Sequence, residues 1–429
     1  MKKSLPFSKI RSFVVLLALL LLAGGVGYQL GERNVSFGVS PDKRVILNTA
    51  SPTGSSVDFA LFWDVWSKLT HYYVDPTMID VQKMVYGAIS GMVSAVGDPY
   101  TSFFPPKENK QFKEDLGGAF EGIGAQLGLK EGRVVIVSPL KGTPAEAAGL
   151  KPSDIILKVD DADTAGWTVE EAVNKIRGPK GTKVKLTILR VTSADGPREI
   201  SITRNTITIP SVTWWVKSPS EVTEIKSATE AAKIRTSSKR VAYIQITRFG
   251  DNTNADWDKA VDGVLAAQAS APLSGLILDL RNNPGGYLEG AVYIGSDFIK
   301  NGTIVSQVNS DKSRQDYTPE KKGRLYTMPV VVLVNKGSAS AAEIVSGALR
   351  DARHAKLIGE TTFGKGTVQT PFDLSGGSSV HITTGKWLLP SGSSISQKGL
   401  TPDIAVPISD TAGATEDAQL ARGIEALLQ

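Results

Sequence analysis

The amino-acid sequence predicts a multi-domain protein of α/β and β class, in which an N-terminal helical segment precedes a β-rich module and an α/β core. Three changes of pattern along the chain support this division. Apolar residues recur at three- and four-residue spacing from about 57 to 111, which favours amphipathic helices. Short β-type runs separated by turn residues begin near 120, and apolar strand patterns alternate with helical stretches from 241 onward.

Composition excludes several kinds of site. Hydrophobic residues make up 41% and charged residues 21% of the 429 positions, as in ordinary globular domains. The absence of cysteine excludes disulfides, thiolate metal sites and a cysteine nucleophile. The three histidines, His71, His354 and His381, are too far apart for the usual zinc motifs, so we expect no metal and no other cofactor.

Residues 1–33 are expected to form a signal peptide or membrane anchor. Four cations between positions 2 and 11 precede an apolar run that starts at Phe13. Counted with its glycines through Tyr28, this run has 16 residues, slightly short of the roughly 20 that span a bilayer, so a cleaved signal and a retained anchor both stay open. Either one places the rest of the chain outside the cytoplasm, in the periplasm or at the cell surface.

The net charge lies mainly in this leader. Residues 1–33 hold five cations and one acid, or +4, so the remaining chain contributes only +1 to the total of +5. Composition therefore gives no support for a nucleic-acid partner.

The regions before the core differ in character. Residues 34–56 are rich in Ser, Pro and Thr and are expected to be a flexible linker. Residues 57–118 form the predicted N-terminal helical region, in which the sequence G-D-P-Y-T-S-F-F-P-P at 97–106 is a rigid turn.

Residues 119–207 form the predicted β-rich module and residues 208–406 the α/β core. The module has strand patterns at 122–129, 133–137, 155–159, 183–190 and 198–204, with short helical stretches near 145 and at 169–176. In the core, strands at 241–246, 276–280 and 330–334 alternate with helices at 257–267, 287–299 and 341–349. A polar excursion at about 217–240 and a C-terminal segment, 407–429, with a helix at 416–428 complete the layout.

A candidate nucleophile lies in N-K-G-S-A-S-A-A-E-I at 335–344, between a predicted strand and a predicted helix. A strand-to-helix turn can expose a hydroxyl and direct backbone N–H groups at one point, which favours Ser340 as a nucleophile. Two alternatives stay open. Ser340 and Glu343 also fit a helix capping box, and Ser338 is a rival nucleophile two residues earlier.

A candidate base lies in T-T-F-G-K-G-T-V-Q-T at 361–370. If this segment is a strand, Lys365, Thr367 and Gln369 share one face. A lysine base must be neutral, so burial has to lower its pKa from about 10.4 towards 7, at a cost of roughly 4 kcal/mol. Gln369 would then orient the amine without adding charge, although an exposed loop lysine is the alternative.

A third segment, D-L-R-N-N-P-G-G-Y at 279–287, also follows a strand. Gly285 and Gly286 can bring backbone N–H groups close to a ligand, as an oxyanion hole requires, although a structural turn is the alternative. Asp279 and Arg281 are expected to anchor this loop.

Together, the three segments resemble the C-terminal processing peptidases, or tail-specific proteases, which are Ser-Lys serine peptidases with a crotonase-like catalytic core. The resemblance rests on the 25 residues from Ser340 to Lys365 and the four from Lys365 to Gln369. It implies that Ser340 is the nucleophile, Lys365 the base and Gln369 its orienting partner. It also implies an oxyanion hole formed by Ala341 and by Gly285 or Gly286, with the choice of glycine left open.

The β-rich module resembles a PDZ domain through E-G-I-G-A-Q-L-G at 121–128 and T-P-A-E-A-A-G-L-K-P-S-D-I-I-L-K-V-D at 143–160. The resemblance implies that a substrate tail adds to the module as a strand. Its terminal carboxylate would then be held by the N–H groups of Ile123, Gly124 and Ala125. In I-R-G-P-K-G-T, Arg177 would couple tail binding to the active site, with an ordinary surface arginine as the alternative.

The resemblance, which covers about residues 59–403, implies an extracytoplasmic hydrolase, a serine endopeptidase that recognises apolar, unstructured protein C-termini and cleaves through an acyl-enzyme. Expected partners are such proteins, an adaptor or regulatory protein, the membrane through the N-terminal segment, and a second copy of the chain. Two alternatives stay open: a PDZ scaffold with a vestigial catalytic core, and a processing enzyme whose PDZ domain acts as an inhibitory gate.

Overall fold

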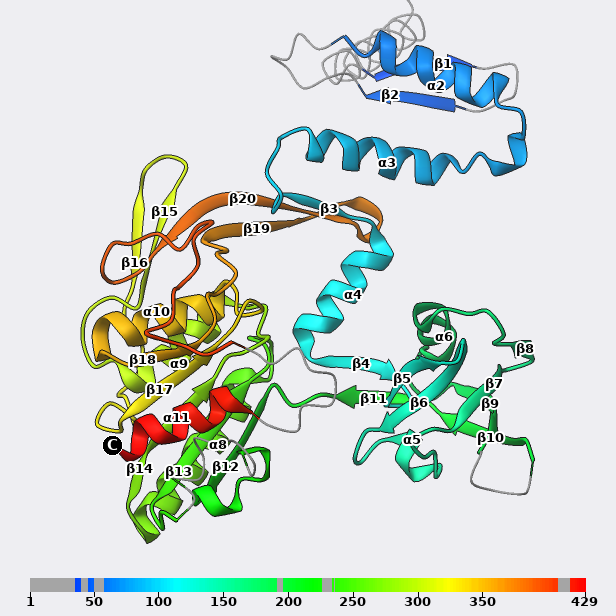
Figure 1. Cartoon of the computed structure of the whole chain (residues 1–429). Coiled ribbons are helices and arrows are strands. Elements are labelled where there is room, and N and C mark those ends of the chain that lie inside the picture. Colours follow the sequence, from blue (N-terminus) through cyan, green and yellow to red (C-terminus); the bar gives the residue numbers. More distant parts are fainter. Residues whose placement is uncertain are drawn as a thin grey trace, which may run out of the picture. The chain divides into compact units, whose positions relative to one another are not determined.

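The computed structural model describes residues 58–190, 196–225, 234, 236–407 and 417–429, and the backbone of 35–39 and 45–49 (Figure 1). The leader predicted at 1–33 lies outside the described residues. Within the described part of the chain, no helix combines the length and the apolar character needed to cross a bilayer.

The chain divides into two compact units, residues 1–85 and 86–429. In the first, β1 (Val35–Val39) pairs antiparallel with β2 (Val45–Thr49), which differs from the flexible linker expected there. The reason is local, because β-branched and aromatic residues, which favour strands, recur in both segments. This unit also holds helix α2 (Ala60–Tyr72), the short 3₁₀ helix η1 (Pro76–Met78) and the start of α3 (Val81–Ser94).

In the second unit, the residues after α3 form β3 (Ser102–Phe104) and α4 (Pro106–Gly117). Gly118, in a left-handed conformation, ends α4 and leads into β4 (Ala119–Gly122). Strand β4 pairs antiparallel with β11 (Asn205–Thr208), so the two strands connect the β-rich module to the chain on either side of it.

The β-rich module is an antiparallel sheet with strand order β10-β9-β7-β6-β5 and two short helices. Its strands are β5 (Ala125–Lys130), β6 (Arg133–Pro139), β7 (Ile155–Val159), β8 (Ala162–Asp163), β9 (Lys183–Leu189) and β10 (Arg198–Thr203). Helices α5 (Pro144–Ala147) and α6 (Val169–Ile176) complete it. Alternating residues such as Val184, Leu186 and Ile188 are fully buried, which gives the module a core of its own.

The α/β core contains a six-stranded sheet with strand order β12-β13-β14-β17-β18-β21. Its strands are β12 (Val212–Lys217), β13 (Arg240–Ile246), β14 (Leu273–Asp279), β17 (Val330–Val334), β18 (Lys356–Gly359) and β21 (Ile404–Ala405). All neighbours except the β12–β13 pair are parallel. Parallel strands buried on both faces explain the unbroken apolar run at 330–334.

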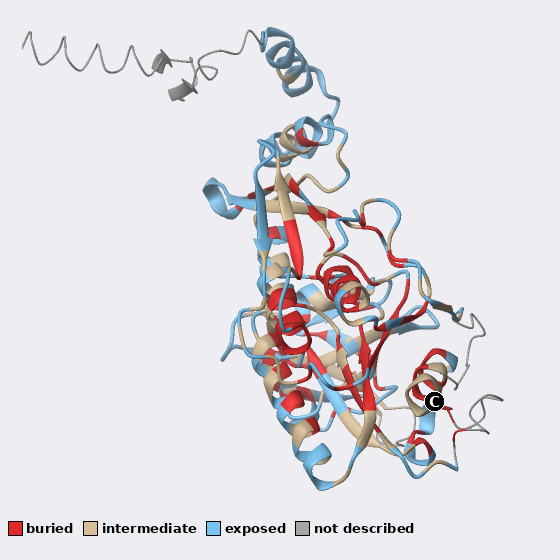
Figure 2. Cartoon of the chain, turned by 90° about the vertical axis from the view of Figure 1, so that its left-hand side faces the viewer, coloured by how far each residue is buried: buried red, intermediate tan, exposed pale blue. Residues whose placement is uncertain are grey.

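Helices cover both faces of this sheet. Helices α8 (Thr253–Ser270), α9 (Leu288–Phe298) and α10 (Ala341–Arg353) pack on one face, and α11 (Ala418–Leu428), a helix predicted from sequence, packs on the other. Along β14, Leu276 and Leu278 face the first group, while Ile277 faces α11. Figure 2 shows the buried residues concentrated in these strands and helices.

The described residues of the polar excursion, 217–225, 234 and 236–240, pack more closely than their composition suggested. They include the 3₁₀ helices η2 (Pro219–Glu221) and η3 (Thr223–Ile225), and they place Val222, Ile225 and Ile234 in the apolar cluster beneath α11. Three apolar residues within a polar stretch give little periodicity. The sequence pattern therefore did not predict that they pack beneath α11.

A second sheet has strand order β16-β15-β20-β19, with β3 also paired to β20. Its strands are β15 (Val305–Asn309), β16 (Arg314–Tyr317), β19 (Thr367–Asp373) and β20 (Ser379–Leu388), and the 3₁₀ turn η4 (Ser375–Gly377) joins the last two. Strands β19 and β20 form a hairpin (Figure 1), and Lys365 lies two residues before β19, so this hairpin carries the candidate base.

Candidate active site

The three candidate segments follow three neighbouring parallel strands. Residues 279–287 follow β14, residues 335–340 follow β17, and residues 360–366 follow β18. Because the carboxyl ends of parallel strands lie at one edge of a sheet, the loops converge there. The structure thus brings together segments that lie about 50 and 80 residues apart in sequence.

Ser340 lies at the turn between β17 and α10. Its backbone has φ 52° and ψ −116°, a region that residues with a side chain rarely occupy. The rival serine, Ser338, is fully buried, and its hydroxyl donates to the Leu280 carbonyl at 2.8 Å and accepts from Asn335 N–H at 2.9 Å. Ser338 therefore holds the turn, while Ser340 remains partly exposed.

The loop after β14 is fixed to the serine loop. Asn282 and Asn335 exchange two hydrogen bonds of 2.8 Å, one from Asn282 N–H and one from Asn335 Nδ2. The Asn283 carbonyl accepts from Ala339 N–H at 2.9 Å. These bonds set the distance between the serine and the glycine turn.

The glycine turn approaches Ser340 so closely that a side chain has no room. A Cβ atom on Gly285 would lie 2.8 Å from the Ser340 Cβ and 3.1 Å from the Ala341 nitrogen. On Gly286 it would lie 2.0 Å from the Phe249 carbonyl oxygen. Positive φ angles of 98° and 137° also favour glycine at both positions.

The two glycine N–H groups have different surroundings. Gly285 N–H donates to Asn283 Oδ1 at 2.8 Å and is therefore engaged. Gly286 forms a parallel bridge with Phe249: Phe249 N–H donates to the Gly285 carbonyl, and Tyr287 N–H donates to the Phe249 carbonyl. In such a bridge the N–H of Gly286 itself points away from Phe249. No described residue accepts a hydrogen bond from Gly286 N–H. As the first residue of α10, Ala341 has no intrahelical acceptor for its N–H.

Lys365 lies in a partly buried position just before β19. Burial lowers the pKa of its amine, and the nearby Asp98 carboxylate acts in the opposite direction. Its Nζ lies 5.5 Å from the centroid of the Tyr100 ring. No described side chain accepts a hydrogen bond from this nitrogen, and Ser340 Oγ is therefore not bonded to it in this structure.

Glu343 connects the serine and lysine loops. Its fully buried carboxylate accepts from Ser340 N–H at 2.9 Å, Lys365 N–H at 3.0 Å, Gly364 N–H at 2.8 Å and the Thr362 hydroxyl. The capping box of Ser340 and Glu343 is present. The structural and functional interpretations of this segment are therefore compatible, because the capping glutamate holds the two candidate catalytic residues in register.

Gln369 has partners other than the one expected. Its Nε2 donates to Thr367 Oγ1 at 2.8 Å and to Thr383 Oγ1 at 3.1 Å, and no hydrogen bond joins it to the described Lys365 amine. Thr367 and Gln369 share a face, as the strand pattern predicted. A shift of register between Val368 and Gln369 against β20 locally changes the pairing of β19.

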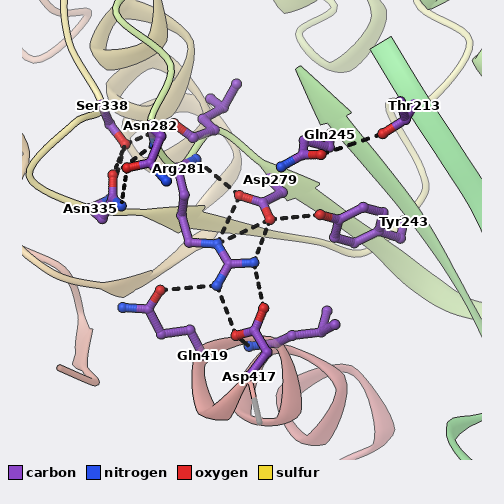
Figure 3. A network of polar contacts seen from close by, with 12 residues as sticks. Thr213, Tyr243, Gln245, Asp279, Arg281, Asn282, Asn335, Ser338, Asp417 and Gln419 are labelled. Atoms are coloured by element: carbon purple, nitrogen blue, oxygen red, sulfur yellow. Dashed lines mark hydrogen bonds and ion pairs between the residues drawn. The ribbon is translucent and has the colours of Figure 1, made fainter. Parts of the chain in front are cut away.

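A buried polar network anchors the β14 loop to the C-terminal helix (Figure 3). The Arg281 guanidinium bonds to Asp279, Asp417 and Gln419, with its contacts to Asp417 both at 2.8 Å. Tyr243 donates its hydroxyl to Asp279 at 2.7 Å, and burial together with this carboxylate raises the pKa of Tyr243. Sequence reasoning identified Asp279 and Arg281 as anchors but missed Asp417, which lies 136 residues from Arg281.

Asp417→Asn is expected to lower the free energy of unfolding by about 1–3 kcal/mol. The Arg281 guanidinium keeps its bond to Gln419 but loses a partly buried counter-charge. Urea denaturation measures the change. Asp161→Asn, which removes an exposed pair with Lys185, should leave the urea midpoint unchanged. Equal midpoints for the Asp417 variant and the parent would contradict this role of the network.

The β-rich module presents free backbone donors at the predicted tail site. The carbonyls of Ile123 and Gly124 accept from Ala145 N–H and Leu140 N–H, but no described residue accepts from the N–H groups of Ile123 and Gly124. The sequence-predicted Ala125 begins β5 directly after them. A Cβ on Gly124 would lie 2.5 Å from the Thr143 Cβ, so glycine shapes this loop.

Arg177 follows α6 and contacts residues outside the sheet of the module. Its guanidinium lies 4.4 Å from the centroid of the Phe120 ring in β4, and one nitrogen lies 3.6 Å from the Glu114 carboxylate in α4. Arg177 therefore contacts both β4 and α4, the two elements that precede the module.

Comparisons with known proteins agree with both parts of the molecule. Models of the PDZ domain and of peptidase family S41 match residues 111–189 and 240–406. The carboxy-terminal processing protease CtpA of Bacillus subtilis (strain 168) is 41% identical over 333 residues, which cover 78% of this chain and 66% of that protein. The carboxy-terminal-processing protease of Bartonella bacilliformis is 34% identical over 368 residues, 84% of this chain and 77% of the relative.

The chain thus spans slightly less than two thirds of the Bacillus relative's length. A crystal structure of a putative S41 protease from Bacteroides fragilis has a TM-score of 0.51 at 15% identity, and the match covers 88% of this chain and 99% of that one. That similarity concerns the fold.

Proposed function

The chain belongs to peptidase family S41, the carboxy-terminal processing proteases, and on this premise we propose that it is an extracytoplasmic serine endopeptidase with a Ser340–Lys365 dyad. The observation that carries the proposal is the position of Glu343, whose carboxylate bonds to the backbone of both dyad residues. The proposed oxyanion hole consists of Gly286 N–H and Ala341 N–H. Gly286 is preferred to Gly285 because Gly285 N–H is already bonded to Asn283 Oδ1.

Lys365 acts as the general base. Its neutral amine takes the proton from Ser340 Oγ as the oxygen bonds to the scissile carbonyl carbon. The oxyanion of the tetrahedral intermediate accepts hydrogen bonds from the Gly286 and Ala341 N–H groups. The lysine ammonium then gives its proton to the leaving amine as the C–N bond breaks, and a water molecule releases the acyl group by the same steps in reverse.

The burial of Lys365 supports this role because it favours the neutral amine. Gln369 bonds to Thr367 and Thr383 on the hairpin that carries Lys365. It therefore holds the strand that positions the base, and it does not bond to the Lys365 amine. Arg177 would couple the PDZ domain to α4, a role that its 3.6 Å contact with the Glu114 carboxylate supports.

Substrates are proteins with free, apolar and unstructured C-termini. The tail would bind along β5, with its carboxylate at the N–H groups of Ile123, Gly124 and Ala125. The extracytoplasmic location rests on the leader at 1–33, which favours export or membrane anchoring.

Cleavage of an unfolded protein ending in apolar residues tests the proposal. We expect the parent to produce new fragments, detected by mass spectrometry over time, and Ser340→Ala to produce none. A substrate with an amidated C-terminus should be cut more slowly, because it lacks the terminal carboxylate. Persistent cleavage by Ser340→Ala would exclude the dyad. Tail binding without cleavage by any version would favour the scaffold alternative.

A further inference from the structure

The turn at residues 97–101 has no place in the proposed reaction so far, although it lies beside the lysine. Its geometry is fixed from within. Asp98 Oδ1 accepts from Tyr100 N–H at 3.2 Å, Asp98 Oδ2 accepts from the Thr101 hydroxyl at 2.6 Å, and the Asp98 carbonyl accepts from Thr101 N–H at 3.3 Å. Pro99 fixes φ between these residues. The sequence predicted a rigid turn over 97–106, but the structure places residues 102–104 in β3 and begins α4 at Pro106.

This turn is bonded to the hairpin that carries Lys365. Directly after it, β3 pairs with β20 through Ser102 and His381, and the Thr101 hydroxyl accepts from Thr383 N–H at 3.1 Å. Strand β20 pairs in turn with β19, which begins two residues after Lys365. The Tyr100 ring is therefore held 5.5 Å from Lys365 Nζ by strand pairing.

The charged and titratable groups around the lysine come from three elements. They are Asp98 and Tyr100 in the turn, His381 in β20, Glu343 in α10 and Ser340 at its N-terminus. Glu343 bonds to the backbone N–H of Lys365 and not to its amine. Asp98 is the carboxylate that stabilises the ammonium form, and the Tyr100 ring offers a cation–π surface within the usual limit of about 6 Å.

We propose that Asp98 and Tyr100 are positioning residues for the lysine base, which hold the ammonium that forms when Lys365 takes the proton of Ser340. This inference rests on the proposed Ser340–Lys365 dyad. The single proton moves from Ser340 Oγ to Lys365 Nζ. The Asp98 carboxylate and the Tyr100 ring take no proton in this step and stabilise the new charge. The role resembles that of a carboxylate behind a catalytic imidazole, which orients the base and does not take the proton.

The first test measures Lys365 directly and needs no activity. In Ser340→Ala protein, the reactivity of the Lys365 amine towards an acetylating reagent is followed against pH by peptide mass spectrometry. The midpoint of this pH curve is the pH at which half of the Lys365 amine is reactive. Because Asp98 and the Tyr100 ring both favour the ammonium, Asp98→Asn and Tyr100→Leu should each lower this midpoint by about half to one pH unit. An unchanged midpoint in both variants would overturn the proposal.

Two variants serve as controls. Tyr100→Phe keeps the ring and should keep the parent's midpoint. Asp75 accepts from the N–H and hydroxyl of Thr77 in a similar Asp-capped turn, so Asp75→Asn alters the same kind of cap at another place in the sequence. A midpoint shift in Asp75→Asn equal to that in Asp98→Asn would show a general effect of turn loosening and contradict a specific role.

The second test uses the Ser340-containing protein and the pH dependence of kcat/KM. Asp98→Asn should move the acid limb to lower pH and reduce the plateau by about tenfold or more, because less stabilisation reaches the ammonium in the transition state. A reduced plateau with an unmoved acid limb would indicate a merely structural role. If the parent cleaves no substrate but Asp98→Asn still lowers the acetylation midpoint of Lys365, the peptidase proposal is contradicted and the positioning inference is supported.

Discussion

Lys365→Met is expected to lower kcat/KM by about 10⁴-fold or more while making the protein more stable at neutral pH. The first effect follows from removal of the base that must accept the Ser340 proton, since a nucleophile and its base act as a unit. Methionine has a similar length, so it fills the site without a proton acceptor. Cleavage is measured as kcat/KM on an unfolded substrate, with Lys322→Met, at an exposed lysine, as the matched control.

The stability effect follows from the lowered pKa of the Lys365 amine. The folded protein binds a proton there more weakly than the unfolded chain does, so the ammonium destabilises the fold below the ordinary pKa of 10.5. Urea denaturation should therefore show a higher midpoint for Lys365→Met at pH 7. The difference from the parent should narrow as the pH rises towards 10.5, because both states of the parent then lose the proton. A parent that is more stable than Lys365→Met at pH 7, by a margin that does not change with pH, would contradict the inferred burial.

The sequence predicted that the serine and glycine segments follow strands, and the resemblance to the tail-specific proteases implied that they share one site with Lys365. Strand β18, which precedes the G-K-G segment, was not predicted. In the structure all three segments follow neighbouring parallel strands, whose carboxyl ends lie at one edge of the sheet. The strand pattern also predicted that Thr367 and Gln369 share a face, which their hydrogen bond confirms.

Sequence reasoning failed where a contact depends on distant pairing. Gln369 bonds to Thr383 because β19 pairs with β20 through a register shift. The local sequence pattern does not predict that shift. Asp417 reaches Arg281 only because α11 packs on the sheet face opposite α8, α9 and α10. Asp98 and Tyr100 were visible as a turn, but their position beside Lys365 comes from the pairing of β3 with β20.

Gly286→Ala is expected to reduce kcat by about 10²–10³-fold with little change in KM, the loss typical of removing one oxyanion-hole donor. The added Cβ would lie 2.0 Å from the Phe249 carbonyl oxygen, and the backbone at φ 137° disfavours a side chain. The loop must therefore move, and its N–H moves with it. Steady-state kinetics on a tail-bearing substrate separates kcat from KM, and circular dichroism checks that the variant is folded.

Gly302→Ala separates the loss of the donor from backbone strain. Gly302 also has a positive φ, 93°, but a Cβ there would meet no atom within 4 Å. Both variants carry a conformational penalty, yet only the one at 286 displaces the proposed oxyanion donor. Parent-like kcat in folded Gly286→Ala would exclude its N–H as the oxyanion donor. Because Gly285 N–H is already bonded to Asn283, Ala341 would then be left as the one backbone donor of the proposed pair.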